Sequence, residues 1–375
     1  MKVLYIINNL TKGGAERFVL DLLIFLHKTS SIEYRLAVLN DENDYEEYDK
    51  KILNLTNLNY TTFSLRKKNK NSVLKNLLDD FKPDIIHSNL FLSEFSTVLD
   101  VRKDIKYVCH GHDNMHQFKS LRFKDLFNKQ RLLNRLEYVI LKNKKYNIAQ
   151  TYFIVNSKHT FSFFKKQLPK NQKKNVRLIQ CGFNYDKYFQ KNDHILNKKI
   201  RLVNVGSYQL KKNQQFIVDI AEVLKNRGVD FEINLIGDGS EFEKVKRKIE
   251  HKKLSNHVFQ RGLQSNVQEW YQKSDIYLHS ANYEPFGLVF LEAMAAGLPI
   301  VTLDGKGNRD IIENDKNGYL FHEENAELFA NKIIEFTTDK KKYKEMSDFA
   351  QNYAKTFDVS IKNKKLIEFY ESILD

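Results

Sequence analysis

The chain has 375 residues, of which 42% are hydrophobic and 29% charged, and its formal net charge is +14. This length favours two domains, because single hydrophobic cores stop growing at about 250–300 residues. No uninterrupted apolar run reaches the roughly 18 residues that a membrane-spanning helix needs, and the positive charge predicts attraction to nucleotides, nucleic acids or anionic membrane surfaces.

The start of the chain and its cysteines indicate a cytoplasmic protein. The first ten residues, MKVLYIINNL, contain one lysine and then Asn8 and Asn9, so we interpret them as a strand and not as a signal peptide. Cys109 and Cys181 both lie in apolar, strand-like contexts, and two such cysteines do not indicate a disulfide framework.

Short apolar runs alternate with amphipathic stretches, which predicts an α/β architecture with parallel sheets. In the first half the predicted strands are 2–7, 34–40, 60–65, 84–87, 107–109, 153–155 and 176–180. Gly13 and Gly14 precede a predicted helix at 15–26. Two glycines before a helix allow a ligand to approach the backbone, although such a pair is usually only a turn.

His110, His112 and Asp113 follow the fifth predicted strand, at the strand end where open α/β sheets bind ligands. A catalytic or substrate-binding histidine and a structural one fit this spacing equally well. A metal site is disfavoured. His110 and His112 should point to opposite sides of an extended chain, and no cysteine or third histidine has helical spacing to them.

Residues 119–145 contain nine basic and two acidic side chains, with apolar residues at spacings of seven, three and four. This pattern predicts one basic amphipathic helix, which either packs on a core with a solvated face or lies on a membrane surface. A second basic run follows the third predicted strand. The basic residues that we expect at an anionic membrane are Arg66, Lys67, Lys68, Lys70, Arg122, Lys124, Lys129 and Arg131.

The polar stretch 184–199 is a candidate linker to a second α/β series. The strands predicted there are 200–205, 233–236, 257–260, 276–279, 299–303 and 319–321, and the chain ends in a predicted helix at 361–374. Both halves open with a strand, glycines and a helix, as two doubly wound domains would.

Two acids, Glu284 and Glu292, flank a predicted turn at 285–287 and lie before and inside an apolar predicted helix at 288–296. Free N–H groups at a helix start suit a phosphate, and neighbouring carboxylates can accept hydrogen bonds from hydroxyls. The segment therefore predicts a ligand with both groups, such as a nucleotide sugar. In the alternative, Glu284 caps the helix and Glu292 pairs with a buried cation.

Together these segments resemble the retaining family 4 glycosyltransferases of the GT-B fold, over nearly the whole chain. The resemblance is carried by residues 13–17, 83–87, 205–206, 212–213, 237–239 and 261–262, and most specifically by 284–297. It implies two Rossmann-like domains that face each other across a cleft. Residues 1–190, with a returning helix at 358–375, would bind the acceptor, and residues 191–357 the nucleotide sugar.

The resemblance also implies roles for individual residues. Lys212 would neutralise the donor diphosphate, Glu284 would contact the donor sugar, and His112, with His110 as the runner-up, would orient a sugar hydroxyl; Lys212, Glu284 and His112 are the catalytic candidates. Glu292 would hold the ribose hydroxyls. The other donor-binding positions are Gly14, Ser207, Leu263, Phe286, Gly287 and Leu288.

Three positions depart from the family pattern. Asp310 stands where the family has a glutamate after its Gly-Gly segment. Ser207 stands where the family commonly has an arginine, so one phosphate-binding cation is missing. Candidates to replace it are Arg201, Lys211 and Arg309. Cys181 stands where the family usually has an asparagine before glycine.

The implied activity is hexosyl transfer with retention, from a UDP- or GDP-linked sugar to a glycan acceptor, with no cofactor and no obligatory metal. The sequence has no Asp-x-Asp motif, as this implies. Because the surface is basic, we expect a lipid-linked acceptor in bacterial-type surface polysaccharide, capsule or lipopolysaccharide synthesis. We also expect peripheral attachment to the inner face of the cytoplasmic membrane.

Two alternatives stay open. A transferase of the same fold could act on a soluble small-molecule acceptor. A protein of a different class could bind anions or nucleic acid without catalysis. The chain has no recognition-helix, RRM, KH or zinc-finger signature, and aromatic residues are not interleaved with its basic runs, so we do not expect a nucleic-acid partner.

Overall fold

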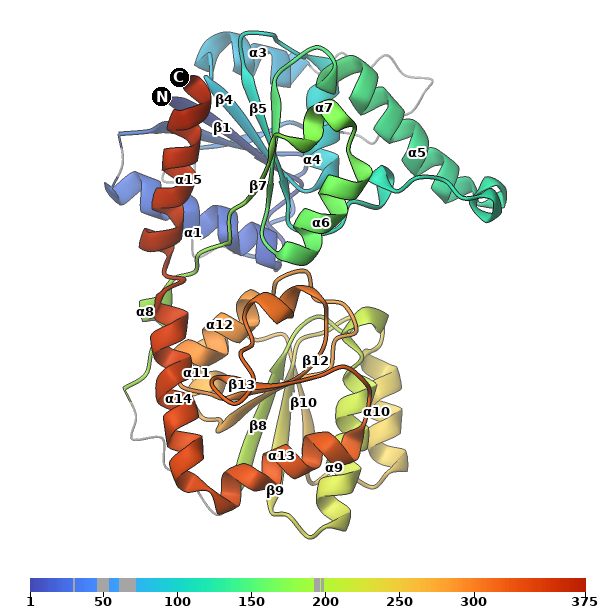
Figure 1. Cartoon of the computed structure of the whole chain (residues 1–375), viewed down its shortest axis with the longest axis vertical. Helices are drawn as coiled ribbons and strands as arrows, with labels where there is room; N and C mark the ends of the chain where they lie inside the picture. The colour runs from blue at the N-terminus through green and yellow to red at the C-terminus, as the bar shows by residue number, and fades with distance from the viewer. Residues whose placement is uncertain (30, 46–53, 61–71, 192–195, 197–198) are drawn as a thin grey trace. The chain divides into compact units, whose positions relative to one another are not determined.

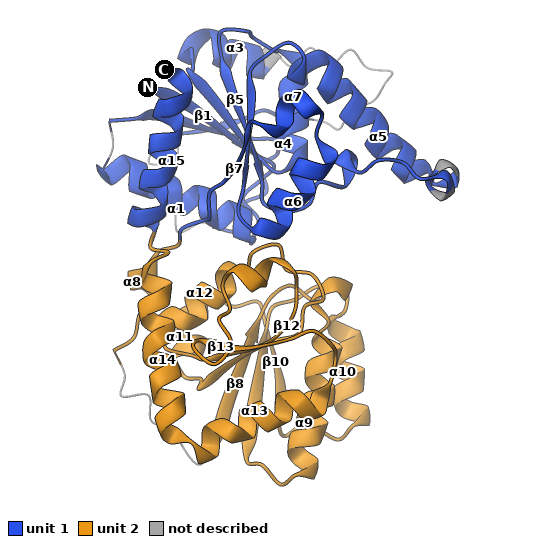
Figure 2. Cartoon of the chain, in the orientation of Figure 1, with its two compact units in different colours: residues 1–182, 359–375 blue, residues 183–358 orange. Residues whose placement is uncertain are grey.

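The computed structural model describes the chain apart from residues 30, 46–53, 61–71, 192–195 and 197–198. The chain divides into two compact units, which are Met1–Gly182 with Val359–Asp375 (unit 1) and Phe183–Asp358 (unit 2) (Figure 2). A parallel sheet with helices around it forms the centre of each unit (Figure 1). Both units are thus Rossmann-like, as the sequence predicts.

In the described part of unit 1, seven parallel strands form one sheet in the order β3-β2-β1-β4-β5-β6-β7. They are β1 (Lys2–Ile7), β2 (Glu33–Val38), β3 (Leu55–Asn57), β4 (Ile85–Asn89), β5 (Lys106–Gly111), β6 (Thr151–Val155) and β7 (Val176–Leu178). The strand order reverses between β1 and β4, and ligands bind at the carboxyl ends of such strands in doubly wound sheets.

Helices cover this sheet, which is why β4 and β6 are buried along their whole length. They are α1 (Gly14–Thr29), α3 (Ser72–Phe81), α4 (Phe91–Ser96), α5 (Lys129–Leu141), α6 (Lys158–Gln167), α7 (Lys170–Lys173) and α15 (Val359–Leu374). Short helical turns lie at η1 (Thr97–Leu99), η2 (His116–Phe118), η3 (Phe123–Phe127) and η4 (Lys142–Tyr146). The C-terminal helix α15 returns to unit 1 and packs against α1.

The described residues of unit 2 form a six-stranded parallel sheet in the order β10-β9-β8-β11-β12-β13, which reverses between β8 and β11. Its strands are β8 (Ile200–Val205), β9 (Phe231–Ile236), β10 (Val258–Gly262), β11 (Ile276–His279), β12 (Ile300–Leu303) and β13 (Gly318–Phe321). Its helical segments are α8 (Tyr185–Tyr188), η5 (Leu210–Lys212), α9 (Gln214–Asn226), α10 (Phe242–His251), α11 (Val267–Gln272), α12 (Leu288–Ala295), η6 (Gly307–Asp310), α13 (Ala326–Thr338) and α14 (Lys340–Lys355).

Two segments differ from the prediction near the boundaries. The strand predicted at 60–65 lies, after Tyr60, outside the described residues, and the strand beside β2 is the short, polar Leu55–Asn57. The first segment of unit 1 ends at Gly182, eight residues before the predicted boundary at 190. The first part of the candidate linker instead forms α8, because Tyr188 is buried and its ring lies 6.0 Å from that of Tyr271.

The prediction of a single basic helix over residues 119–145 is wrong. Only Lys129–Leu141 is α-helical, and the side chain of Asn128 caps it by accepting a hydrogen bond from the Arg131 N–H group at 3.0 Å. The 3₁₀ turn η3 precedes this cap and the π turn η4 follows the helix. None of the described helices is long and apolar enough to span a bilayer.

Lys145, which the sequence analysis counts among the basic residues of that helix, is fully buried. Its Nζ lies 2.8 Å from Glu94 Oε2 and 2.6 Å from Thr97 Oγ1, and it sits 4.4 Å from the ring centroid of Tyr107. Glu94 is fully buried too, and also accepts a hydrogen bond from Ser88. Removing either charge would therefore leave the other uncompensated in the interior.

We expect Lys145→Met to lower the free energy of unfolding of unit 1 by about 3–5 kcal/mol, because Glu94 would be left as an unpaired buried carboxylate. Thermal and urea unfolding would measure the loss. Lys344→Met is the matched control, since Lys344 pairs with Asp348 on an exposed face and should cost less than about 1 kcal/mol. Equal losses in the two variants would contradict this account of the buried pair.

Candidate functional site

The centre of the candidate site is an ion pair between the two strands at which the unit 2 sheet changes direction. Lys212 follows β8 and Glu284 follows β11, and Lys212 Nζ lies 2.6 Å from Glu284 Oε2. The Ser280 hydroxyl donates to the carbonyl oxygen of Lys212 at 2.8 Å and holds its backbone in place. The pair thus lies at the carboxyl edge where doubly wound sheets bind ligands.

Glu284 is charged at neutral pH although it is only 7% exposed. Burial alone would raise its pKa, but the Lys212 ammonium and the ring of His279 outweigh burial and lower the pKa to about 2. The Nε2 atom of His279 lies 3.4 Å from Glu284 Oε2. A carboxylate with so low a pKa is a weak base and a good acceptor of hydrogen bonds.

His279 is a neighbour of Glu284 that the sequence analysis does not single out. It ends β11, is buried, and its Nδ1 lies 3.2 Å from the Tyr277 hydroxyl, which donates to the Val205 carbonyl oxygen at 3.2 Å. With its proton on Nε2, the His279 ring faces the Glu284 carboxylate, and its Nδ1 lies against the Tyr277 hydroxyl. Burial lowers the pKa of His279, while Glu284 acts in the opposite direction. The sequence offered one signal for this contact: His279 ends a predicted apolar strand, and Glu284 follows that strand.

The turn before α12 leaves the helix start without a side-chain cap. The N-cap is Gly287, with φ of +95°, where an added Cβ would meet the Phe290 ring at 2.4 Å. The alternative in which Glu284 caps the helix is therefore wrong. Phe286 is buried and Leu288 half-buried, so both side chains anchor the turn. The Phe290 N–H group donates to the Gly287 carbonyl oxygen at 3.1 Å, and the N–H groups of Leu288 and Val289 precede this first hydrogen bond of α12.

The loop after β12 packs directly on the backbone of Glu284. The Glu284 N–H group donates to the Gly305 carbonyl oxygen at 2.7 Å, and the Gly307 N–H group donates to the Glu284 carbonyl oxygen at 3.0 Å. A Cβ at Gly305 would lie 2.7 Å from Glu284 Cβ, and one at Gly307 would lie 1.8 Å from the Pro285 carbonyl oxygen. Both glycines are thus required by this close approach, which positions Glu284.

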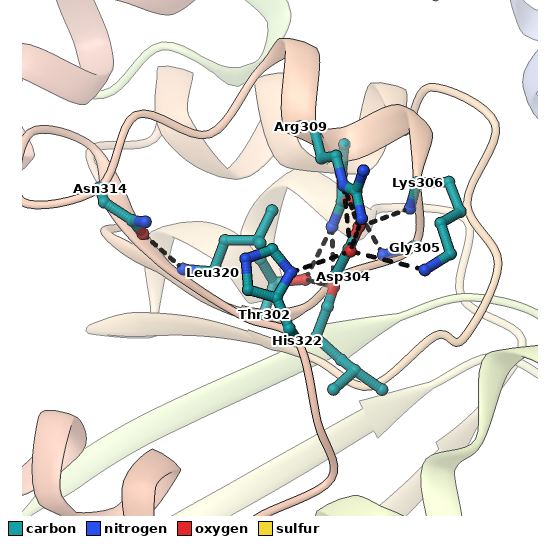
Figure 3. A network of polar contacts seen from close by, with 10 residues as sticks. Thr302, Asp304, Gly305, Lys306, Arg309, Asn314, Leu320 and His322 are labelled. Carbon is teal, nitrogen blue, oxygen red and sulfur yellow. Dashed lines mark hydrogen bonds and ion pairs between the residues drawn. The ribbon is translucent and has the colours of Figure 1, made fainter. Parts of the chain in front are cut away.

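Asp304 begins this loop and is surrounded by three basic side chains (Figure 3). Arg309 Nε lies 2.9 and 3.0 Å from its two oxygens, Lys306 Nζ 3.6 Å away and His322 Nδ1 3.1 Å away. Burial alone would raise the pKa of Asp304, but Arg309 and the other donors hold it well below its usual range. Asp304 therefore offsets positive charge of Arg309 and Lys306 that would otherwise attract an anion.

These contacts narrow the choice of a cation that could replace the arginine missing at Ser207. Arg201 lies near the amino end of β8, away from the site edge, and binds both oxygens of Asp275 at 3.2 and 3.0 Å. Arg309 is held by Asp304. Lys211, next to Lys212 in η5, is the candidate whose place in the fold fits best.

The remaining predicted donor positions lie in α12, after β8 and β10, and at the start of α1. Glu292 is 8% exposed and accepts a hydrogen bond from the Tyr271 hydroxyl at 3.0 Å. Ser207 follows β8 and Leu263 follows β10, and both are exposed. In unit 1, a Cβ on Gly14 would meet no atom within 4 Å, so packing does not require glycine there. A ligand that approaches the start of α1 would explain it.

The two histidines of unit 1 do not point to opposite sides, so that expectation is wrong. The rings of His110 and His112 stack with centroids 3.9 Å apart and planes 20° apart. The strand β5 ends at Gly111, and the His112 N–H group donates to the His110 carbonyl oxygen at 3.2 Å, which folds the second ring back onto the first. Burial lowers the pKa of His112 to about 3 and lowers that of His110 as well, so both rings are neutral.

The structure thus brings the predicted residues together in two groups. Lys212 and Glu284 meet within unit 2, where they are joined by His279. His112 and His110 meet within unit 1.

Two family models match the chain. Residues 12–187 match the one described as Glycosyltransferase Family 4, and residues 184–353 match the one described as Glycosyl transferases group 1. The chain belongs to glycosyltransferase family 4. Solved structures confirm the GT-B fold of this family 4 chain. Anabaena Alr3699/HepE, in complex with UDP and glucose, aligns over 99% of this chain and 100% of that one, with a TM-score of 0.80 and 20% identity.

Two further proteins with known roles are similar to this family 4 chain. WaaG, a glycosyltransferase involved in lipopolysaccharide biosynthesis, aligns over 97% of this chain and 98% of that one, with a TM-score of 0.73 and 17% identity. The poly(glycerol-phosphate) alpha-glucosyltransferase of Bacillus subtilis (strain 168) is 28% identical over 165 residues. These make up 44% of this chain but 24% of that protein, so the match spans about a quarter of that relative's length.

We expect Lys212→Met to destabilise unit 2 by an amount that depends on pH. The pKa of Glu284 is about 2 in the folded protein against an ordinary 4.5, so its stabilisation is complete above pH 4.5 and is lost as pH falls toward 2. Without Lys212 the loss near neutral pH should be on the order of 3 kcal/mol and should shrink through that window.

Thermal unfolding between pH 3 and pH 7 would measure this difference. Lys273→Met, which removes an exposed lysine paired with Glu269 in the same unit, is the control and should have a small effect. A Lys212→Met deficit that stays constant across the window would show that the ion pair does not set the pKa of Glu284.

Proposed function

We propose that this family 4 chain transfers a hexose from a nucleotide-diphosphate sugar to a glycan acceptor, with retention of configuration at the anomeric carbon. The observation that carries the proposal is the Lys212–Glu284 pair at the strand reversal of unit 2, next to the uncapped start of α12. A single edge of the sheet thereby offers positive potential for a diphosphate and acceptors for hydroxyl groups.

The chemistry of the transfer needs this combination. Negative charge grows on the departing diphosphate as the glycosidic bond breaks, and Lys212 with the first N–H groups of α12 would stabilise it. Glu284 would accept hydrogen bonds from the donor sugar, and Glu292 from the ribose. Because Glu284 has a strongly lowered pKa, it suits this role better than that of a general base.

We propose that retention follows from a front-face mechanism without a covalent intermediate. In this mechanism the acceptor attacks the anomeric carbon from the same side on which the diphosphate leaves. His112 is neutral, and its Nε2 lies 2.9 Å from Asn89 Oδ1, so the ring is held in one orientation. Such a ring can orient a sugar hydroxyl without adding charge near the reacting carbon. No metal or other cofactor is assigned a role in this route.

A UDP- or GDP-linked sugar is the proposed donor. The HepE structures contain UDP with glucose or UDP-glucose, and that neighbour has the same fold over 99% of this chain, which supports a uridine nucleotide first. Thermal-shift measurements with a panel of nucleotide sugars, and assays of their slow hydrolysis, would identify the donor. Oligonucleotide gel shifts without any nucleotide-sugar response would favour the non-catalytic alternative.

A lipid-linked glycan is the proposed acceptor, in synthesis of a surface polysaccharide or lipopolysaccharide. One relative is named for transfer to poly(glycerol phosphate), and WaaG takes part in lipopolysaccharide biosynthesis. Poly(glycerol phosphate) is an anionic polymer, and an anionic acceptor suits a chain with a net charge of +14. A soluble small-molecule acceptor is the alternative.

The segment η3–α5 supports attachment of unit 1 to an anionic membrane. It extends away from the sheet of unit 1 (Figure 1) and exposes both apolar and basic side chains. Phe123 is 82% and Phe127 86% exposed, and their rings lie 6.4 Å apart. Large apolar residues that are about 40% exposed continue along α5: Leu132, Leu133, Leu136 and Val139.

Basic residues lie among these apolar ones, and include Arg122, Lys129, Arg131 and Arg135. Basic residues near an anionic surface each contribute about 1 kcal/mol, and buried aromatic rings add a term that does not depend on charge. The other basic run predicted at the membrane, residues 66–70, lies outside the described residues. The attachment proposed here therefore combines charge with insertion of the two phenylalanines.

We expect Phe123→Ser/Phe127→Ser to weaken binding to anionic vesicles by about 100-fold. The variant has lost the two aromatic rings that would move from water to the edge of the acyl chains. Sedimentation with phosphatidylglycerol-containing and neutral phosphatidylcholine vesicles would measure binding. Phe349→Ser, which removes a partly exposed phenylalanine from α14 in unit 2, is the matched control. Equal binding to anionic and neutral vesicles, or unchanged binding of the double variant, would rule the attachment out.

We expect Glu284→Ala to lower transfer by at least about 100-fold while the chain still folds, because the donor sugar loses its charged acceptor and Lys212 its partner. Steady-state turnover with the identified donor would show the loss. Glu345→Ala, which removes an exposed acid of α14, should retain full activity. Undiminished turnover of folded Glu284→Ala would refute the assignment.

A further inference from the structure

A buried thiol lies beside the stacked histidines of unit 1 and has no part in the proposed transfer. Cys181 Sγ and one ring nitrogen each of His110 and His112 all lie within 4.8 Å of one another. All three residues are buried, and none of them forms a disulfide. Within the part of the chain that the structure describes, no other trio of such side chains comes together in this way.

The order of the strands explains why these residues meet. In the sheet of unit 1, β5 pairs with β6 and β6 pairs with β7, all in parallel, so their carboxyl ends share one edge. His110 and His112 lie at the end of β5, and Cys181 follows β7. A search for metal-ligand spacing along the sequence cannot find this group, because about seventy residues separate its members.

The surrounding hydrogen bonds direct free ring nitrogens toward the group. The amide nitrogen of Asn89 is within 3.5 Å of the carbonyl oxygens of Ile6 and His87, so its oxygen faces His112. His112 therefore carries its proton on Nε2 and leaves the Nδ1 lone pair available. This is the outer-shell pattern of metal-binding histidines, whose second nitrogen donates to an oxygen acceptor.

His110 completes this arrangement. Its Nδ1 lies 3.2 Å from His87 Nε2, while its Nε2 is buried and has no hydrogen-bond partner among the described residues. Buried polar atoms are rarely left unpaired without a reason. With its proton on Nδ1, His110 would present the Nε2 lone pair to an ion beside Cys181.

We propose that His110, His112 and Cys181 bind a single Zn²⁺ ion. Two imidazole nitrogens and one thiolate are ligands that zinc prefers, and three protein ligands leave a fourth position for water or a sugar hydroxyl. The Cys181 S–H bond breaks as the S–Zn bond forms, its proton goes to solvent, and no electron is transferred. The ion draws the three donor atoms from their present spacing to about 2.0–2.3 Å from its centre.

Zinc at this position occupies the nitrogen lone pair of His112. This consequence rests on the proposed function, in which His112 orients a sugar hydroxyl, and it makes the ion an inhibitor of transfer. The binding itself does not rest on that function. Binding and inhibition are therefore measured separately.

Cobalt titration of the metal-free full chain tests the binding. Co²⁺ is used as the probe because a thiolate ligand gives a near-ultraviolet charge-transfer band, which Zn²⁺ then removes by displacement. One ion per chain is expected, with the band lost and affinity lowered by at least about 10-fold in Cys181→Ala. Cys109→Ala is the matched control, since Cys109 is also buried but packs in the apolar cluster with Phe118 and Phe153.

The proposal is overturned if the wild-type chain gives no thiolate band, or if the two cysteine variants bind the probe equally well. Should Cys181→Ala fail to fold, His110→Asn keeps the thiol and must still lower cobalt affinity by the same order. Zinc should inhibit transfer by the wild type and by Cys109→Ala, and not by Cys181→Ala. Intact binding without inhibition would refute the role of His112 in transfer and leave the metal site standing.

Discussion

The Lys212–Glu284 ion pair is the interaction on which the candidate site of unit 2 depends. It joins the segment after β8 to the segment after β11, at the reversal of strand order. Taking two charges out of water is unfavourable unless they pair with good geometry, and here His279 adds a second contact to the carboxylate. The pair thereby keeps a charged acceptor and a cation at one place before any donor arrives. In the proposed reaction Lys212 would be shared between Glu284 and the diphosphate.

Glycines determine how precisely Glu284 is held. Gly305 and Gly307 let the loop after β12 approach the Glu284 backbone more closely than any side chain would permit. Gly287 has the positive φ at which α12 can begin without a side-chain cap. The motif that most resembles the family is therefore a set of backbone requirements around one carboxylate, together with the helix start beside it.

Unit 1 is organised in a comparable way, with polar side chains buried at the ends of apolar strands. His87, His110 and His112 form a chain of contacts that begins at the Tyr370 hydroxyl on α15. The C-terminal helix is thus tied to the interior of the first half of the chain. Neutral imidazoles cost less to bury than charged ones, and burial lowers their pKa accordingly. Burial also raises the pKa of the Cys181 thiol, so Cys181 stays a neutral thiol until the proposed metal ion displaces its proton.

The sequence by itself determined most of the strands and the family. Strands 2–7 and 200–205 have the predicted limits, because a short run rich in Val, Ile and Leu and bounded by polar residues or glycine is a local property. The glycine, lysine and glutamate motifs likewise placed Lys212 and Glu284 next to a shared sheet edge. What only the tertiary structure decided was which side chains meet: His279 beside Glu284, Lys145 with Glu94, and Cys181 beside His110. These contacts depend on strand order and on where each strand ends. The backbone turns at His112, directly after β5, and this turn stacks the rings of His110 and His112. In a continued extended strand the two side chains would have pointed to opposite sides.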